Sequence, residues 1–208
     1  MQIIFLFVFL SSLGLQAASE KINVKFFRQE FPSTCEAAAV RMVLNFYGIQ
    51  VKENELISKM PVDSTERTDE IWGDPELGFV GYVYGKNNRV SYGLHAKPTA
   101  KWMSNWKNAE SYELADLKAL QQLIKDKKPV IAWIQKGKSE KVSWKTLQGK
   151  KIETYLGEHT VVVIGFSKVN GTDEIIFLDP EFGETRIKSE IFLETWNRFN
   201  RQVVTINE

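Results

Sequence analysis

Cys35 is the only cysteine of this 208-residue chain, and the residues around it predict that it lies at the start of a helix. Ser33 and Glu36 have the spacing of a capping box, with the serine as N-cap and the glutamate at the third helical position. In a first helical turn, free backbone N–H groups and the helix dipole stabilise negative charge. We therefore expect the pKa of the Cys35 thiol to lie below its usual value of about 8.5, which favours a thiolate nucleophile.

The same cysteine also has a structural interpretation. Free cysteine is among the most buried residue types, and Cys35 could serve as a small apolar core residue. A single thiol has no partner for an internal disulfide, so the chain either buries Cys35 or uses it. Its position along the chain does not separate these two interpretations.

Two later residues could complete a site for nucleophilic chemistry. Such chemistry needs a base that takes a proton and a group that orients the base. His159 begins one apolar segment that is typical of a strand, and Asp179 ends the next one. Asn170-Gly171 between them is a hairpin turn signal, so both residues should lie at the same end of an antiparallel pair. There the carboxylate can hold the imidazole tautomer and stabilise its charged form.

The register of this hairpin decides whether the two side chains meet. A two-residue turn at Asn170-Gly171 would pair Asp179 with Val162 and not with His159, so contact requires a longer loop or a bulge. A histidine at a strand start and an Asp-Pro pair also have ordinary roles, as a polar edge residue and a turn opener. The order of cysteine, histidine and aspartate along the chain is the more specific signal.

The composition narrows the classes of function. With 27 basic and 26 acidic residues the net charge is +1, so no overall field favours nucleic acid or an anionic membrane. The 43% hydrophobic content and the six tryptophans predict a folded globule. Two histidines and one cysteine are too few for a zinc site, and we expect no metal and no cofactor. The composition leaves the oligomeric state open.

The first 18 residues carry no charged side chain and contain the apolar run 3–10. The run is shorter than the roughly 20 residues that span a bilayer, and small and polar residues follow it up to Ala17-Ala18. No Lys or Arg precedes the run, which leaves an uncleaved membrane anchor as the alternative. We expect a signal peptide over 1–18, a single domain over 19–208, and an exported protein without membrane contact after cleavage.

Hydrophobic periodicity predicts the elements that would position these residues. Helices are expected over 34–47, 53–59, 98–106, 113–126 and 189–199, and strands over 22–27, 130–134, 159–166, 174–178 and 202–206. The turn-rich stretch 72–88 is interpreted as a long ordered loop, and the lysine-rich stretch 136–151 as a solvated hairpin. Helices come first and an antiparallel sheet follows, which is an α+β pattern.

Several of these segments are similar to a known family. The similarity is carried by 29–36 around the cysteine, 72–81, 128–133, 158–166 around the histidine, 179–183 and 192–204. They resemble the papain-like cysteine peptidases of the bacteriocin-processing type, which act on double-glycine leaders. The resemblance is closer to their exported stand-alone relatives, the peptidase family thirty-nine-like domains, and runs from about Lys25 to Ile206.

The resemblance implies a papain-like fold, in which an N-terminal helical part with the nucleophile helix packs on a C-terminal antiparallel sheet. It implies that Cys35 is the nucleophile, that His159 is the general base and acid, and that Asp179 orients the histidine. Gln29, six residues before the cysteine, matches the glutamine that donates its amide to the oxyanion, with the Cys35 N–H as a second donor. The partner would be a peptide or protein substrate.

These inferences predict an exported cysteine peptidase-like hydrolase that cleaves a peptide or amide bond through a thioester intermediate. Leader peptidases of this type are usually cytoplasmic domains fused to an exporting transporter, so we do not expect double-glycine specificity in a chain with a signal-like start. An amidase or an acyltransferase would use the same triad. In a different class, a catalytically silent binding module that keeps the fold as a recognition surface is the alternative.

Overall fold

The computed structural model describes residues 19–85 and 91–207, so the predicted signal peptide over 1–18 lies outside the described residues. The helices are α1 (Cys35–Phe46), α2 (Glu53–Ser58), α3 (Ala96–Met103), α4 (Leu117–Lys125) and α5 (Ser189–Asn197). The strands are β1 (Ser19–Lys21), β2 (Val62–Asp63), β3 (Phe79–Gly81), β4 (Ser91–Gly93), β5 (Ala109–Glu113), β6 (Val130–Gln135), β7 (Lys141–Lys145), β8 (Lys151–Tyr155), β9 (Glu158–Val169), β10 (Thr172–Asp179), β11 (Gly183–Lys188) and β12 (Gln202–Ile206). Within the described residues, no helix combines the length and the apolar composition that a bilayer crossing needs.

The main sheet has seven strands and is built around β9. Its order is β11-β10-β9-β6-β12-β5, with antiparallel pairs throughout. One edge of β9 serves two partners, because residues 158–163 pair with β6 and residues 165–167 pair with β1. Strand β1 therefore continues the sheet beyond Val130, the first residue of β6.

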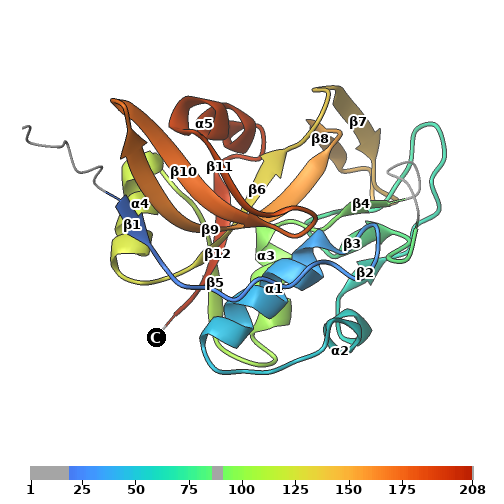
Figure 1. The fold of residues 1–208 in the computed structure, drawn as a ribbon. Helices are drawn as coiled ribbons and strands as arrows, with labels where there is room; N and C mark the ends of the chain where they lie inside the picture. The colour runs from blue at the N-terminus through green and yellow to red at the C-terminus, as the bar shows by residue number, and fades with distance from the viewer. Residues whose placement is uncertain (1–18, 86–90, 208) are drawn as a thin grey trace, which may run out of the picture.

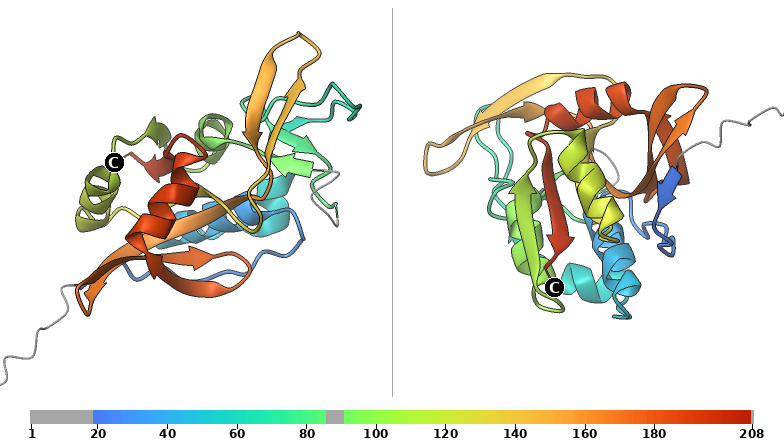
Figure 2. Two further views of the ribbon diagram at one scale, coloured as in Figure 1. Left: turned by 90° about the horizontal axis from the view of Figure 1, so that it is seen from above. Right: turned by 90° about the vertical axis from the view of Figure 1, so that its left-hand side faces the viewer.

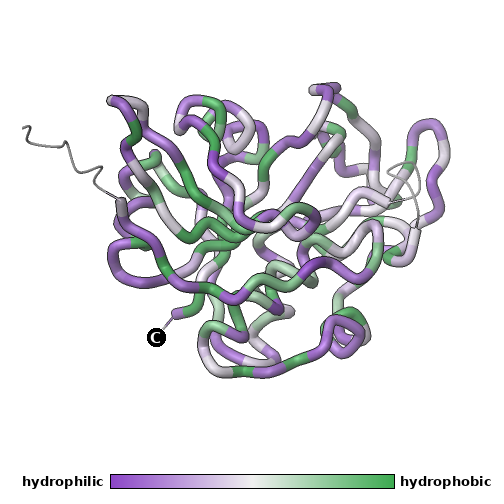
Figure 3. The backbone as a smooth tube through the Cα atoms, viewed as in Figure 1, coloured by the Kyte–Doolittle hydropathy of each residue, from purple (hydrophilic) through white to green (hydrophobic). Residues whose placement is uncertain are grey.

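Helices cover the sheet, with α1 on one side and α5 on the other (Figure 1). α1 contacts β9 and β6, and α5 contacts β6, β10 and β11. Apolar residues gather along the central strands and on α1, as Figure 3 shows, and every residue of β6 is buried. A strand buried on both faces explains the continuous apolar run that predicted it. The α+β class, with the helix that begins at Cys35 packed on an antiparallel sheet, is confirmed.

Most predicted elements are present with shifted ends, but several predictions are wrong. No strand covers 22–27, because the first strand pairs three residues earlier, at Ser19–Lys21. The helix predicted over 113–126 begins at Leu117, since Asp116 caps it by accepting the Ala119 N–H at 2.9 Å, and the residues before it form β5. Helix α3 begins two residues before the predicted start at Pro98 and ends at Met103. Strand β11 and the small β2-β3-β4 sheet, which crosses the predicted loop 72–88, were not predicted.

The lysine-rich hairpin is confirmed as β7 and β8, which extend away from the body of the molecule in Figure 2. Its inner face is nevertheless anchored. The Trp144 ring is buried and lies 5.3 Å from the Trp72 ring, centroid to centroid, and its Nε1 donates to the Gly73 carbonyl at 2.7 Å. The hairpin is therefore solvated on one face only.

Candidate active site

A cavity of about 300 Å³ lies where the start of α1 faces the start of β9. Cys35, His159 and Gln29 all line it. Asp179, the fourth residue predicted from the sequence, is buried and contacts His159. The fold thus brings the segment that contains Gln29 and Cys35 together with two residues from the far end of the chain, His159 and Asp179.

Helix α1 begins at Cys35, but the predicted capping box is wrong. The N-cap is Thr34, and no side chain caps the helix start. The Ser33 hydroxyl donates to the Gly85 carbonyl at 3.2 Å, and the Glu36 carboxylate accepts the Leu94 backbone N–H at 3.0 Å. Both side chains bind segments that the fold brings close. The local sequence around Cys35 does not indicate these partners.

Glu53, at the start of α2, fixes the loop that leads into Cys35. Its fully buried Oε1 accepts the Glu30 backbone N–H at 3.0 Å and the Thr34 hydroxyl at 2.5 Å. The Thr34 hydroxyl in turn accepts the Phe31 N–H at 3.3 Å. Burial raises the pKa of Glu53, against the lowering effect of these hydrogen bonds. The N-cap residue next to the cysteine is therefore held by a side chain from another helix.

His159 and Asp179 form the predicted pair. With the aspartate ionised, His159 Nε2 donates to Asp179 Oδ1 at 3.0 Å. Burial opposes the charge of Asp179, but the hydrogen bond and the charge of His159 outweigh it and hold the pKa of the carboxyl below its ordinary value. The Glu181 N–H also donates to Asp179 Oδ1, at 2.8 Å. A charged carboxylate fixed in this way orients the imidazole.

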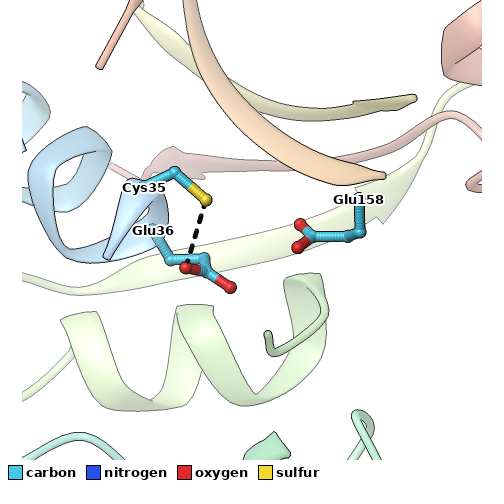
Figure 4. A group of neighbouring side chains, drawn as sticks. All are labelled: Cys35, Glu36 and Glu158. Atoms are coloured by element: carbon cyan, nitrogen blue, oxygen red, sulfur yellow. Dashed lines mark hydrogen bonds between the residues drawn. The ribbon is translucent and has the colours of Figure 1, made fainter. Parts of the chain in front are cut away.

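The environment of Cys35 differs from the expectation. Its thiol is buried and donates to Glu36 Oε2 at 3.4 Å, as the dashed line in Figure 4 marks, and it makes no hydrogen bond to His159. Burial raises the pKa of the Cys35 thiol, and the charges of Glu36 and Glu158 raise it further. A hydrogen bond with the Thr160 backbone lowers the thiol pKa, but by less than burial and the two charges raise it. The predicted depression of the thiol pKa is therefore wrong, because two carboxylates and burial outweigh the helix start.

Two carboxylates stand beside the thiol. Glu36 extends from α1 and Glu158 reaches toward it from β9 (Figure 4), and oxygens of both lie with Cys35 Sγ within 4.8 Å of one another. Burial raises the pKa of Glu36 to about 7 despite the hydrogen bonds to its carboxylate. Burial and the charge of Glu36 raise the pKa of Glu158. Among the described residues, these three could hold a metal ion, which would then engage the sulfur itself.

Gly93 makes this arrangement possible. Its φ is +104°, a left-handed conformation that L side chains rarely adopt. A Cβ at this position would lie 2.4 Å from Glu36 Oε1 and 2.5 Å from Glu158 Oε2. Glycine is therefore required both by the backbone and by the two carboxylates that it lets approach.

Gln29 lies at the cavity, but its amide is engaged by backbone carbonyls. Nε2 donates to the carbonyls of Phe31 at 2.9 Å and Pro32 at 3.1 Å, and the buried Oε1 has no partner. The Gln29 backbone N–H donates to the Pro180 carbonyl at 3.0 Å, which ties this loop to the turn after Asp179. An oxyanion donor role stays a prediction that requires the amide to turn into the cavity.

Glu158, Gly93 and Lys136 are among the cavity residues that the sequence did not single out. Lys136 forms an ion pair with Glu181, and its Nζ lies 4.0 Å from Asp179 Oδ2. The available signal was a glutamate next to each proposed catalytic residue, one after Cys35 and one before His159. That the two glutamates, Glu36 and Glu158, lie close together follows only from the fold.

His95 received no role from the sequence. Its Nδ1 lies 2.5 Å from Glu76 Oε1, and both residues line a different cavity. The second histidine is therefore not part of the Cys35 site.

Comparisons with known proteins bear on the family and the fold of this chain. The sequence model of the Peptidase_C39 like family matches residues 21–204. The uncharacterized protein YvpB of Bacillus subtilis (strain 168) is 25% identical over 211 residues, which cover 95% of this chain and 80% of YvpB.

Solved structures share the fold. A candidate C39-like peptidase from Bacillus anthracis superposes with a TM-score of 0.78 at 22% identity, over 91% of this chain and 98% of that one. The peptidase domain of Streptococcus ComA, a bifunctional ABC transporter involved in quorum sensing, gives a TM-score of 0.55 at 17% identity, over 89% of this chain and 100% of that one. A double glycine motif protease from an AMS/PCAT transporter, in complex with the leader peptide, gives 0.50 at 15% identity, over 90% and 95%.

Proposed function

This chain belongs to the Peptidase_C39 like family, and from that premise we propose that it is an exported cysteine hydrolase that cleaves a peptide or amide bond. The observation that carries the proposal is the shared cavity. It joins a cysteine at a helix start to a histidine whose ring is held by a buried, charged aspartate. This is the arrangement that nucleophilic cysteine chemistry needs.

The roles follow from the positions. His159, oriented by Asp179, takes the proton of the Cys35 thiol as the sulfur attacks the carbonyl carbon, and gives that proton to the leaving amine as the C–N bond breaks. Water activated by His159 then hydrolyses the thioester and restores the thiol. The Cys35 backbone N–H at the start of α1, together with a turned Gln29 amide, would stabilise the oxyanion. No double-glycine specificity is proposed.

Incubation of the full chain with a complex peptide library, read by mass spectrometry, tests the proposal. We expect new peptide termini with the wild-type protein and none with Cys35→Ala. A library left intact by the wild-type protein under these conditions would contradict a peptidase. N-terminal sequencing of the exported protein tests the export, which predicts a start near Ala18 or Ser19 and is contradicted by an intact Met1.

A catalytically silent binding module is the second candidate, and one observation favours it. The Cys35 thiol is buried, bonded to Glu36, and has a raised pKa. If the module is silent, peptides from the library should bind without cleavage, and Cys35 should react with an electrophilic thiol probe as slowly as a buried structural cysteine.

A further inference from the structure

We propose that the exposed face of the β7-β8 hairpin binds an acidic segment of the polypeptide substrate beside the Cys35 cavity. The residues that bind it form a basic strip, Lys138, Lys141 and Lys145. The inference rests on the proposed function and deepens it, because it names the class of substrate. That class is a polypeptide with Asp or Glu residues within a few positions of the cleaved bond.

The first argument is the place where the hairpin begins. The chain enters it through Lys136-Gly137 and returns through Leu156-Gly157, and all four residues line the cavity that contains Cys35 and His159. The Lys136 N–H donates to the Gly157 carbonyl at 2.7 Å, which closes the base of the hairpin. From this base the two strands extend away from the body of the molecule (Figure 2). A peptide that leaves the cavity at this rim therefore lies beside the hairpin.

The second argument is the unpaired charge of the basic strip. Residues 136–151 contain six lysines and one glutamate, although the net charge of the whole chain is only +1. Three of these lysines have carboxylate partners, namely Lys136 with Glu181, Lys150 with Asp74 and Lys151 with Glu153. The lysines of the basic strip are exposed, and within residues 19–85 and 91–207 they form no ion pair. An anionic partner would therefore meet charges that the fold leaves unpaired.

The third argument is that the basic strip is held in place. Lys141 and Lys145 are exposed whereas Trp144 is buried, so the alternation of β7 directs both lysines to one face. The backbone of β7 is also fixed on the edge that does not pair with β8. The Trp72 N–H donates to the Lys145 carbonyl at 3.0 Å, and the Lys145 N–H donates to the Glu70 carbonyl at 2.7 Å. A surface that is ordered before binding loses less conformational entropy when a partner binds.

The fourth argument concerns the kind of partner. Membrane-binding surfaces combine basic residues with several apolar ones that enter the bilayer. Among residues 137–156, Leu147 at the tip is the one exposed large hydrophobic residue, and the strand opposite the strip carries Glu153 on the exposed face. A row of lysines along one strand suits carboxylates along an extended chain instead. From Lys138 to Lys145 the strip spans at most about 25 Å, which is about seven residues of an extended peptide.

Binding of an acidic probe tests the inference without turnover. The probe is a fluorescein-labelled octapeptide of alternating glutamate and serine, and the control peptide has glutamine in place of glutamate. The parent protein is the full chain with Cys35→Ala, so that no thioester can form. Fluorescence anisotropy measures the dissociation constant at about 20 mM and about 200 mM NaCl.

The hairpin variant replaces the three lysines of the basic strip with glutamine. The matched control removes the same charge from three exposed lysines of α3, α4 and β11, namely Lys101→Gln, Lys118→Gln and Lys188→Gln. We expect the hairpin variant to bind the glutamate peptide roughly 10-fold more weakly than the parent, and the control to stay within about 2-fold. The higher salt concentration should weaken binding to the parent and to the control, and the glutamine peptide should bind to none of them.

The inference is overturned if the parent does not bind the glutamate peptide at low salt, or if the hairpin variant and the control weaken binding equally. Phosphatidylglycerol vesicles that cosediment with the parent but not with the hairpin variant, without binding of the peptide, would assign the surface to a membrane and also overturn it. Thermal unfolding checks that the variants fold. The single substitution Lys141→Glu is the second variant, and it should weaken binding more than Lys141→Gln does.

The peptide library separates this inference from the proposed function. With Cys35 intact, we expect the cleaved sequences to be enriched in Asp and Glu within about seven residues of the new termini, and the hairpin variant to lose this enrichment. An intact library together with strip-dependent binding of the glutamate peptide contradicts the hydrolase and supports the acidic-peptide surface. A library that is cleaved without such enrichment overturns the surface and leaves the hydrolase in place.

Discussion

Asp179 reaches His159 because β9 contains one extra residue. Ile176 pairs with Gly165, but the next pairs are Phe177 with Val163 and Leu178 with Val162, so Ile164 is the extra residue of a bulge. In this register Asp179 follows beside position 161, on the same face of β9 as the histidine two residues away. Without the bulge, the two-residue turn would direct Asp179 to the opposite face.

This relationship predicts a graded effect of two substitutions. His159→Ala should abolish peptide turnover, because it removes the group that protonates the leaving amine. Asp179→Ala should lower turnover but leave it measurable, since the aspartate only orients the ring and stabilises its charge. Steady-state kinetics on a peptide identified from the library checks both. Equal loss in the two variants would contradict the division of roles.

A substitution of Gln29 tests its proposed oxyanion role. Gln29→Ala should lower turnover by on the order of 10²–10³-fold while the alkylation rate of Cys35 stays close to the wild-type value. The reason is that an oxyanion donor acts on the substrate oxygen and not on the sulfur. If alkylation slowed as much as turnover, the hydrogen bonds of Gln29 to Phe31 and Pro32 would be its function, and the role would be structural.

Local signals in the sequence predicted most of the helices, strands and turns. Contacts between residues that are distant in the chain depend on the fold and could not be predicted in this way. Gly48, with φ of +83°, ends α1 near the predicted residue, and Asn170 and Gly171 both adopt positive φ in the predicted turn. Contact between His159 and Asp179 required a longer loop or a bulge, and the structure has a bulge at Ile164.

The partner of Glu36 is not encoded in its local sequence. Its spacing from Ser33 predicted a capping box, but the partner of its carboxylate is Leu94, 58 residues away along the chain. The prediction of a lowered thiol pKa was wrong for the same reason, because Glu158 approaches Cys35 only after β9 packs against α1. Burial and distant charges are properties of the fold and are not encoded in local spacing.

The two carboxylates predict how the stability of the fold depends on pH. The pKa of Glu36 rises on folding from 4.5 to about 7, and that of Glu158 is raised well above 4.5, both first of all by burial. Such groups contribute stability that is full below the unfolded pKa and is lost as the pH rises through the folded pKa. The pKa of Asp179 is lowered, so its contribution persists throughout this range.

We therefore expect the free energy of unfolding to fall between about pH 5 and pH 8, by up to about 3 kcal/mol from Glu36. Urea unfolding at the two pH values measures the change. Glu36→Gln and Glu158→Gln should each make the pH dependence flatter. A wild-type protein that gains stability over this range would contradict the buried pair.

Glu53 should be important for stability through the loop before Cys35. Glu53→Ala removes the acceptor of the Glu30 N–H and one of the two acceptors of the Thr34 hydroxyl, which can still donate to the Phe31 carbonyl at 3.0 Å, so it should cost about 1–3 kcal/mol. Glu53→Gln keeps an acceptor oxygen and should cost less. The exposed Glu55 on the same helix is the matched control, and Glu55→Ala should stay within about 0.5 kcal/mol of the wild type in urea unfolding.

Gly93→Ala should disturb the cavity more than a backbone effect explains. The new Cβ would clash with the carboxylates of Glu36 and Glu158 in addition to straining the positive φ. Gly149, with φ of +82° and no atom within 4 Å of a Cβ, is the matched control for strain alone. Gly149→Ala should cost about 1–2 kcal/mol, and Gly93→Ala should cost clearly more and change the alkylation rate of Cys35. Equal costs and an unchanged rate would argue against the close approach.

The pairing of β1 with β9 protects an edge of the sheet. Beyond Val130, where β6 begins, residues 165–167 of β9 would otherwise present free backbone N–H and C=O groups, and β1 covers them. An uncovered strand edge is a template for pairing with another chain and hence for aggregation. A chain that lacks the residues up to Lys21 would therefore keep its cavity residues but expose an unpaired strand edge. Strand β1 thus protects the protein against self-association.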